Sequence, residues 1–429
     1  MEDAAFIADK GILLAVGPWK DLRKDWTGSI TDLQERVVLP GLVNPHVHLE
    51  YTDMLGELPF QQGFTNWVDQ MVQLKRSWEP IQYQRSWLKG LEQQIPCGTT
   101  TLADTLSHHP LLGCMAKPPR SPRLKILLEW IHTQDAPLSS SSTDRMQHTL
   151  TLADQWSDGL AGSSPHAPYT TTPSLWEALG NLPQSPERIC SVHLAESLEE
   201  ISYFQEANGP LFDWLSRAGI QNTWGQGHPI RLLNRSQLIP QGMLAIHANI
   251  LEARDIQILA SHRATMVHCP RSHAFFDHPP FPLHDCLQAG IPVALGTDSL
   301  ATIKKPAPIH PFHLFHEAKE ALKQFPTLRP STALGMITFQ AARVLGLEKK
   351  VGSLAPGMAC DWISTPTEAT LKMRLPPSSN PSLNGIMSSR RASLFLRRHL
   401  NKKRGWDVLK KENDAMLGID PQAGSANLF

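Results

Sequence analysis

Four apolar segments of this chain each end in histidine or acidic residues, and this repeated arrangement limits the possible folds more than any other feature. Their polar ends are His46-Val-His48, His193-Leu-Ala-Glu196, His247 and Gly296-Thr-Asp298. The aliphatic and β-branched residues before each end are typical of buried strands. In a (β/α)8 barrel, parallel strands of different sequence present their C-terminal ends at one mouth, where that fold carries its chemistry. We therefore expect an α/β protein built on a (β/α)8, TIM-like barrel.

The first of these segments, residues 37–48, ends in a His-x-His pair. Side chains alternate along a strand, so His46 and His48 point to the same side and can bind one ion. Such a pair alone is equally well explained as two unrelated histidines, because short motifs have little specificity. The other three segments favour one shared hydrolytic metal site. Glu196, which follows His193 where the strand ends, is suited to transfer protons beside the metal rather than to bind it.

The chain resembles the amidohydrolase superfamily, in particular the branch that contains the triazine hydrolases, guanine deaminase and the adenosine-type nucleoside deaminases. Besides the segments above, the matching stretches are Cys-Gly-Thr-Thr-Thr at 97–101, Ser-Pro-His-Ala-Pro-Tyr at 164–169, Val-His-Cys-Pro at 267–270 and Gly-Ser-Leu-Ala-Pro-Gly at 352–357. The resemblance extends in order from about residue 13 to about residue 362. It implies a metal-dependent hydrolase barrel and a hydrolytic deaminase activity.

The resemblance also implies a set of site residues. One divalent metal ion, zinc or less often iron, would be bound by His46, His48, His193 and Asp298. Glu196 and His247 would be catalytic rather than ligands, and Asp298 could also accept a proton. Three imidazoles and one carboxylate leave a coordination position open for water, as a catalytic site requires. The implied reaction is attack by the metal-bound hydroxide and release of ammonia, with Glu196 as the proton carrier.

Four further residues are expected to contact the substrate. His166 lies where relatives use a histidine for this purpose. Trp67 follows the first strand, where aromatic rings often stack on flat heterocycles, although core packing explains it equally well. Arg271 and His273 follow the seventh strand, where they could bind a substrate carboxylate. A salt bridge between Arg271 and a neighbouring loop is an equally good interpretation.

The segment Cys-Pro-Arg-Ser-His-Ala-Phe-Phe at 269–276 is similar to the aminofutalosine deaminases of the alternative menaquinone pathway. This resemblance implies deamination of 6-amino-6-deoxyfutalosine, in which an adenine is joined to a benzoate through a ribose-derived linker. Arg271 would then meet the carboxylate. S-adenosylhomocysteine, adenosine, guanine or a triazine are alternative substrates for the same machinery. A noncatalytic scaffold is an alternative of another class, less favoured because all the chemical positions are present together.

Composition limits the partners and the compartment. The formal net charge is zero, which argues against a general polyanion partner such as nucleic acid. Six cysteines occur at wide spacings without a Cys-x-x-Cys pair, which favours free thiols in a reducing compartment. No basic N-terminal region precedes an apolar stretch, and no apolar run approaches membrane-spanning length. We therefore expect a cytoplasmic enzyme with a small-molecule substrate and no membrane partner. The family resemblance is compatible with a homodimer.

The expected organisation has four parts. Residues 1–40 would begin a small β-sandwich, 41–345 would form the barrel, and 346–375 would complete the sandwich. Residues 376–429 would form a linker and a basic tail. The N-terminal part looks abbreviated relative to the family, as in a truncated sandwich. The basic residues between 389 and 411 are better explained as a solvated helix face or a subunit contact than as a nucleic-acid or membrane patch.

Overall fold

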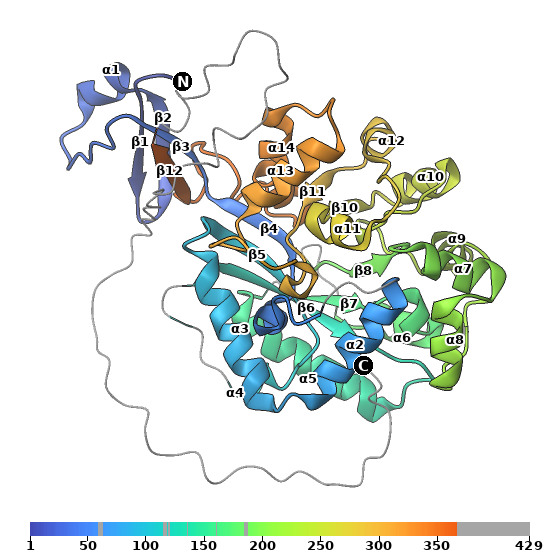
Figure 1. Cartoon of the computed structure of the whole chain (residues 1–429). Coiled ribbons are helices and arrows are strands. Elements are labelled where there is room, and N and C mark those ends of the chain that lie inside the picture. The colour runs from blue at the N-terminus through green and yellow to red at the C-terminus, as the bar shows by residue number, and fades with distance from the viewer. Residues whose placement is uncertain are drawn as a thin grey trace.

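The centre of the fold is a set of parallel strands that follow one another in chain order (Figure 1). The computed structural model of the protein describes residues 1–58, 63–114, 118, 121–134, 136–159, 161–183 and 188–366. The central strands are β4 (Leu42–Val47), β5 (Thr99–Leu106), β6 (Arg123–Trp130), β7 (Gly162–Pro165), β8 (Ser191–Leu194), β9 (Leu244–His247), β10 (Thr265–His268) and β11 (Val293–Leu295).

These strands close into a barrel. They form two parallel sheets, ordered β4-β5-β6-β7 and β8-β9-β10-β11. Parallel bridges join the two sheets at both edges, between Ser163 and Cys190 and between Val47 and Asp298. The interior holds small and branched apolar side chains, including Val43, Ala103 and Leu127. A packed interior leaves the C-terminal ends of the strands as the place for a cavity, and the predicted (β/α)8-type fold is confirmed.

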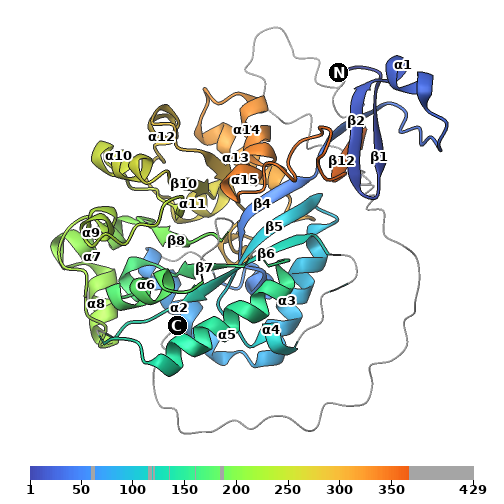
Figure 2. The same ribbon diagram turned by 180° about the vertical axis from the view of Figure 1, so that it is seen from behind.

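Helices cover the outside of the barrel, with α3 and α5 seen on the face that Figure 2 turns to the viewer. They are α2 (Phe64–Ser77), α3 (Pro80–Gln94), α4 (Leu111–Cys114), α5 (Ser140–Trp156), α6 (Pro173–Gly180), α7 (Leu198–Glu206), α8 (Pro210–Arg217), α9 (Pro229–Arg235), α10 (Ala253–Ser261), α11 (Pro270–Phe276), α12 (Leu283–Gln288), α13 (Leu314–Gln324), α14 (Pro330–Met336) and α15 (Phe339–Val344). Short 3-10 helices follow several strands: η2 (Leu49–Met54), η3 (Pro168–Thr170) and η4 (Leu300–Thr302). Many of the helices begin with proline, whose fixed φ and missing N–H suit the first helical position.

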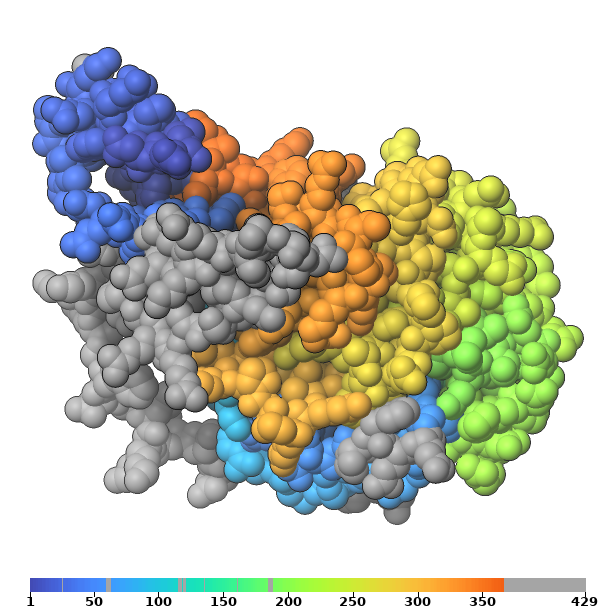
Figure 3. Space-filling view, turned by 45° about the horizontal axis from the view of Figure 1, so that its top comes forward, coloured from blue at the N-terminus to red at the C-terminus, as the bar shows by residue number. Residues whose placement is uncertain are grey.

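A small region beside the barrel contains both the start of the chain and residues near 360. It comprises β1 (Ala4–Asp9), β2 (Ile12–Pro18), α1 (Trp19–Leu22), η1 (Arg23–Asp25), β3 (Arg36–Pro40) and β12 (Trp362–Pro366). Strand β1 pairs antiparallel with β2, and β3 pairs antiparallel with β12. Figure 3 shows the blue N-terminal residues as a lobe that contacts the orange segment. The pairing of β3 with β12 agrees with the expected joining of the two ends, while the domain boundaries remain a prediction.

Three further features bear on the sequence-based expectations: membrane-spanning helices, the cysteines and the C-terminal segment. None of the helices in the described ranges is both long enough and apolar enough to cross a bilayer. All six cysteines are free thiols. The predicted linker and the basic segment 389–411 lie outside the described residues.

Candidate active site

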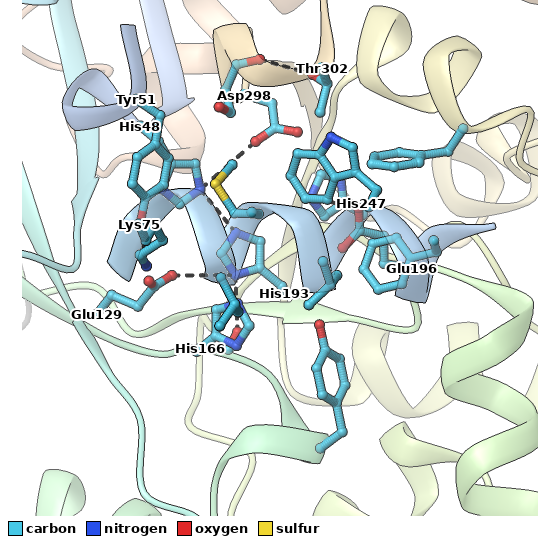
Figure 4. Close-up of a pocket in the computed structure, with 18 of the residues that line it drawn as sticks. His48, Tyr51, Lys75, Glu129, His166, His193, Glu196, His247, Asp298 and Thr302 are labelled. Carbon is cyan, nitrogen blue, oxygen red and sulfur yellow. Dashed lines mark hydrogen bonds and ion pairs between the residues drawn. The ribbon is translucent and has the colours of Figure 1, made fainter. Parts of the chain in front are cut away.

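Most of the predicted site residues meet in one cavity at the C-terminal ends of the barrel strands. The cavity encloses about 720 Å³ of empty space, including open solvent at its mouth. Figure 4 shows the polar side chains that converge there from different strands. The predicted residues that line it are Trp67, His48, His166, His193, Glu196, His247 and Asp298.

Four side chains form a cluster of possible metal ligands at the base of this cavity. The Nε2 atoms of His48 and His193 lie 3.3 Å apart. Oδ1 of Asp298 lies 3.4 Å from Nε2 of His46 and 3.8 Å from Nε2 of His48. His46, His48 and Asp298 form one group with metal-binding geometry, and His46 and His193 form another with His247. Nε2 of His46 is buried and has no hydrogen-bond partner among the described residues. Converging acceptor atoms with an unpartnered ring nitrogen fit a divalent cation.

The rings of this cluster are oriented by atoms on their outer side. Nδ1 of His193 lies 3.0 Å from the backbone oxygen of His166. Nδ1 of His46 lies 3.2 Å from Oγ1 of Thr105. A hydrogen bond from Nδ1–H fixes the tautomer and leaves the Nε2 lone pair for a metal. In His193, whose Nδ1 faces a carbonyl oxygen, Nε2 is therefore the atom offered to the centre of the cluster.

Burial sets the protonation states that metal binding needs. Burial, followed by the charge of His46, lowers the pKa of His48 well below its usual value and that of His193 to about 4. Burial alone would raise the pKa of Asp298, but the close approach of His46 and the other nearby histidines hold it well below the usual range. Neutral imidazoles and an ionised carboxylate are the forms that ligate a metal.

Glu196 lies outside these possible ligand groups, whereas His247 belongs to one of them and also approaches Glu196. Oε1 of Glu196 is 3.6 Å from Nε2 of His247. Burial, followed by repulsion from Asp298, raises the pKa of Glu196 well above its usual value. A carboxyl group whose pKa is raised toward neutrality is suited to accept a proton and return it. Both oxygens of Glu200 hold the turn, accepting hydrogen bonds from the backbone N–H groups of Ala195 and Glu196.

The backbone at two of these positions is strained. His247 has a φ of 65° and Asp298 a φ of 54°, in the left-handed region that residues with a Cβ seldom adopt. Such conformations persist only where the surrounding structure imposes them, and they concentrate at functional sites. At Asp298 the constraint includes its N–H, which donates to the backbone oxygen of His46 at 3.1 Å. The strain therefore supports a functional role for both residues.

One wall of the cavity is the helix α2. Its residues Phe64, Trp67, Met71 and Lys75 face the cavity at helical spacing, together with Val68 and Val72. The ring of Trp67 packs edge-on against Phe276, with 5.1 Å between ring centroids. The indole Nε1 is buried without a hydrogen-bond partner in the described ranges. The sequence left substrate contact and core packing open for Trp67, and the structure is compatible with both, since the ring packs on Phe276 and also lines the cavity.

Comparison with known proteins assigns the family. Residues 37–392 match the amidohydrolase family, which is most of the chain. The chain belongs to this family. It is 29% identical over 364 residues to a 5-methylthioadenosine/S-adenosylhomocysteine deaminase of Moorella thermoacetica, covering 81% of this chain and 78% of the relative.

Solved structures show the same fold at lower identity. An adenosine deaminase from Xanthomonas campestris with bound zinc superposes with a TM-score of 0.71 at 22% identity, over 91% of this chain and 85% of that one. The aminofutalosine deaminase of Helicobacter pylori gives a TM-score of 0.72 at 16% identity, over 92% and 94%. This amidohydrolase is therefore a hydrolase of carbon–nitrogen bonds, and the relatives it matches are named as deaminases.

Arg271 and His273 of this amidohydrolase lie outside the cavity lining. The Arg271 side chain forms an ion pair through Nε with Glu317, which is fully buried, and Nη2 donates to the backbone oxygen of Pro311 at 2.7 Å. Its Nη1 has no hydrogen-bond partner among the described residues. Nε2 of His273 lies 2.9 Å from the backbone oxygen of Pro279. The arrangement matches the salt-bridge interpretation of Arg271 rather than the substrate clamp.

An acidic residue and a basic residue that line the amidohydrolase cavity, Glu129 and Lys75, were not predicted. Glu129 lies near the C-terminal end of β6, with Oε1 3.8 Å from Nδ1 of His193, and with His48 and His193 it forms a third possible ligand group. Burial raises the pKa of Glu129 to about 8. The sequence carried a weaker form of the same signal, because the short apolar run 126–128 is followed directly by the acid Glu129. Lys75 carried no such signal, because it is one basic residue near the end of a helix.

Proposed function

We propose that this amidohydrolase is a metal-dependent deaminase of an aminopurine nucleoside, with 6-amino-6-deoxyfutalosine as the first candidate substrate. The observation that carries the reaction class is the ligand cluster of His46, His48, His193 and Asp298 with Glu196 beside it. Zinc is the proposed ion, because three imidazoles and one carboxylate suit it and leave an open position. When bound, such an ion lowers the pKa of a water molecule and polarises the carbon that is attacked.

The protein's own groups supply the proton transfers. Glu196 takes a proton at its carboxylate and delivers it to the departing nitrogen, so that ammonia leaves. His247, whose pKa is held well below its usual value by burial, is neutral and places Nε2 beside Glu196. The edge-to-face pair of Trp67 and Phe276 forms an apolar wall suited to a flat heterocycle. His166 lines the cavity at the end of β7 and is the proposed contact to that heterocycle.

S-adenosylhomocysteine is the second candidate substrate. The identity of 29% to a deaminase named for 5-methylthioadenosine and S-adenosylhomocysteine favours it, and that match covers most of both chains. The likeness to the aminofutalosine deaminase supports the first candidate only through the shared fold. Both candidates contain an aminopurine and a carboxylate, so the proposed reaction at the amino-bearing carbon is the same.

Ammonia release tests the proposal. Protein loaded with zinc would be assayed against 6-amino-6-deoxyfutalosine, S-adenosylhomocysteine, 5-methylthioadenosine, adenosine and guanine, with chelated protein as the control. We expect the highest kcat/KM for one of the first two substrates, and no turnover after chelation. Turnover of guanine alone would discard the nucleoside substrate but keep the mechanism. Stoichiometric zinc without ammonia from any member of the panel would contradict the proposed function.

A further inference from the structure

Lys75 is unusual among the basic side chains near the cavity. It is the last member of the α2 stripe that begins at Phe64, and the other members of that stripe are apolar or aromatic. Among the described residues that line the cavity, it is the only lysine or arginine. A basic residue is common in the last turn of a helix, but of the two in the last turn of α2, Lys75 and Arg76, only Lys75 lines the cavity.

The ammonium of Lys75 is held in place by two hydroxyl groups. Nζ donates to the hydroxyl of Tyr51 at 2.8 Å and to Oγ of Ser107 at 3.3 Å. The Tyr51 and Ser107 hydroxyls lie 2.7 Å apart, and Ser107 Oγ donates onward to Oε1 of Glu50 at 2.6 Å. Glu50 is fully buried and also accepts from the backbone N–H of Ser107 and of His108. This chain of hydrogen bonds fixes where the ammonium points.

The partners of Lys75 are neutral, which leaves its charge without a direct counterion. An ammonium has three donors, and the two hydroxyl groups accept two of them. Within the described ranges, no carboxylate oxygen lies within ion-pair distance of Nζ, in contrast to the direct pair between Arg271 and Glu317. Figure 4 shows Lys75 beside Glu129 on the side of the cavity away from Glu196. Glu129 lies near this ammonium without a hydrogen bond to it. Hydrogen bonds between an ammonium and an anionic oxygen are roughly twice as strong as neutral ones.

We propose that Lys75 is a specificity-determining residue, whose remaining N–H donates to an anionic oxygen, a carboxylate, of the substrate. This inference rests on the proposed function and deepens it, because it selects aminopurine nucleosides that carry a carboxylate (acidic substrates, below) over those that carry none. It also replaces Arg271 with Lys75 as the residue that recognises the acid. Tyr51 and Ser107 act as positioning residues, since they contact the ammonium rather than the substrate.

Two substitutions separate the charge of Lys75 from its hydrogen bonds. Lys75→Gln keeps a donor for the two hydroxyls but removes the charge, and Lys75→Arg keeps the charge. Lys323→Gln is the matched control, because Lys323 pairs with Glu320 on α13, away from the cavity. The zinc-loaded variants would be assayed with two pairs of substrates. One pair is S-adenosylhomocysteine, which carries a carboxylate and an ammonium, and 5-methylthioadenosine, which carries neither. The other pair is 6-amino-6-deoxyfutalosine and its benzoate methyl ester, which differ in the carboxylate alone.

We expect Lys75→Gln to lower kcat/KM for the acidic substrate by about 10- to 100-fold and for its neutral partner by less than about threefold, mainly through KM. Lys75→Arg should restore part of the loss, and Lys323→Gln should change neither value. Equal losses for both members of a pair would overturn the role in charge recognition while leaving the deaminase function standing.

A binding measurement covers the case in which no substrate in the panel is turned over, which would contradict the proposed function itself. Titration calorimetry of zinc-loaded protein with benzoate and with benzamide would then compare wild type with Lys75→Gln. Weaker benzoate binding in the variant with unchanged benzamide binding supports the anion site. Benzoate bound directly to zinc would not be affected by Lys75→Gln, so a loss of affinity points to Lys75. Equal benzoate affinity in the two proteins overturns it.

Discussion

Two clusters of buried polar side chains lie at the C-terminal end of the same barrel, and they differ in how their charges are matched. In the cluster of His46, His48 and His193, ring nitrogens converge, with 3.3 Å between Nε2 of His48 and Nε2 of His193. Around Arg271, a guanidinium faces the carboxylate of Glu317. Converging neutral imidazoles beside an ionised carboxylate can bind a cation, whereas an ion pair is complete without a ligand. Position at the mouth of the barrel therefore does not by itself identify a functional residue. A polar group there is a candidate for ligand binding when no protein group already balances its charge.

The largest expected effect is a loss of kcat in Glu196→Gln, which tests whether the cluster at the barrel mouth is catalytic. The amide is nearly isosteric but cannot carry the proton, so kcat should fall by about 10²- to 10⁴-fold. Zinc content should stay at the wild-type level, because Glu196 lies beside the ligand cluster rather than in it. Steady-state ammonia release and elemental analysis of the purified variant would measure both. Glu177→Gln, at an exposed position on α6, is the control. Loss of zinc from Glu196→Gln would make Glu196 a ligand, and normal turnover would exclude it as the proton carrier.

The second effect should appear in stability rather than in rate. Arg271→Ala leaves Glu317 buried without its partner, and burial already raises the pKa of Glu317 against the opposing charge of Arg271. Breaking such a pair costs about 3–5 kcal/mol, while replacing both partners with apolar residues is often nearly neutral. Urea unfolding should therefore show a strongly destabilised Arg271→Ala and a recovered Arg271→Met/Glu317→Leu double variant.

The same variants also test whether Arg271 is structural or binds the substrate. The double variant should keep wild-type kcat/KM for acidic substrates if Arg271 is structural. A loss of more than about tenfold that is confined to acidic substrates, in a variant of normal stability, would return Arg271 to the role of substrate clamp. That outcome would also remove the reason for assigning this role to Lys75.

The sequence predicted the barrel and the cluster because both depend on local pattern. A strand that ends in histidine or an acid keeps that residue at the barrel mouth, whatever the helices do. The place of α2 is set by contacts distant in sequence. Its N-terminal N–H groups at Phe64 and Thr65 donate to the carboxylate of Glu199 at 2.8 Å each. The indole Nε1 of Trp214, on α8, donates to the Asp69 carboxylate of α2. Lys75 could not be predicted as a cavity residue without these long-range contacts, nor Arg271 as the partner of Glu317.

The smallest expected effect is a pH dependence of stability caused by His268, a buried histidine outside the ligand cluster. Burial, followed by the charge of His273, lowers the pKa of His268 to about 3, while the unfolded value is near 6.5. Between these values the unfolded chain binds a proton that the folded protein does not, so stability falls as the pH falls. From pH 6.5 to 5 this histidine alone should cost about 2 kcal/mol of unfolding free energy. His268 contacts Phe281 and Gln324 rather than the ligand cluster, so its share should be the same with zinc or with chelator. His268→Phe should therefore reduce the pH slope of the urea midpoint equally in both conditions. A reduction seen only with zinc bound would instead connect His268 to the metal site.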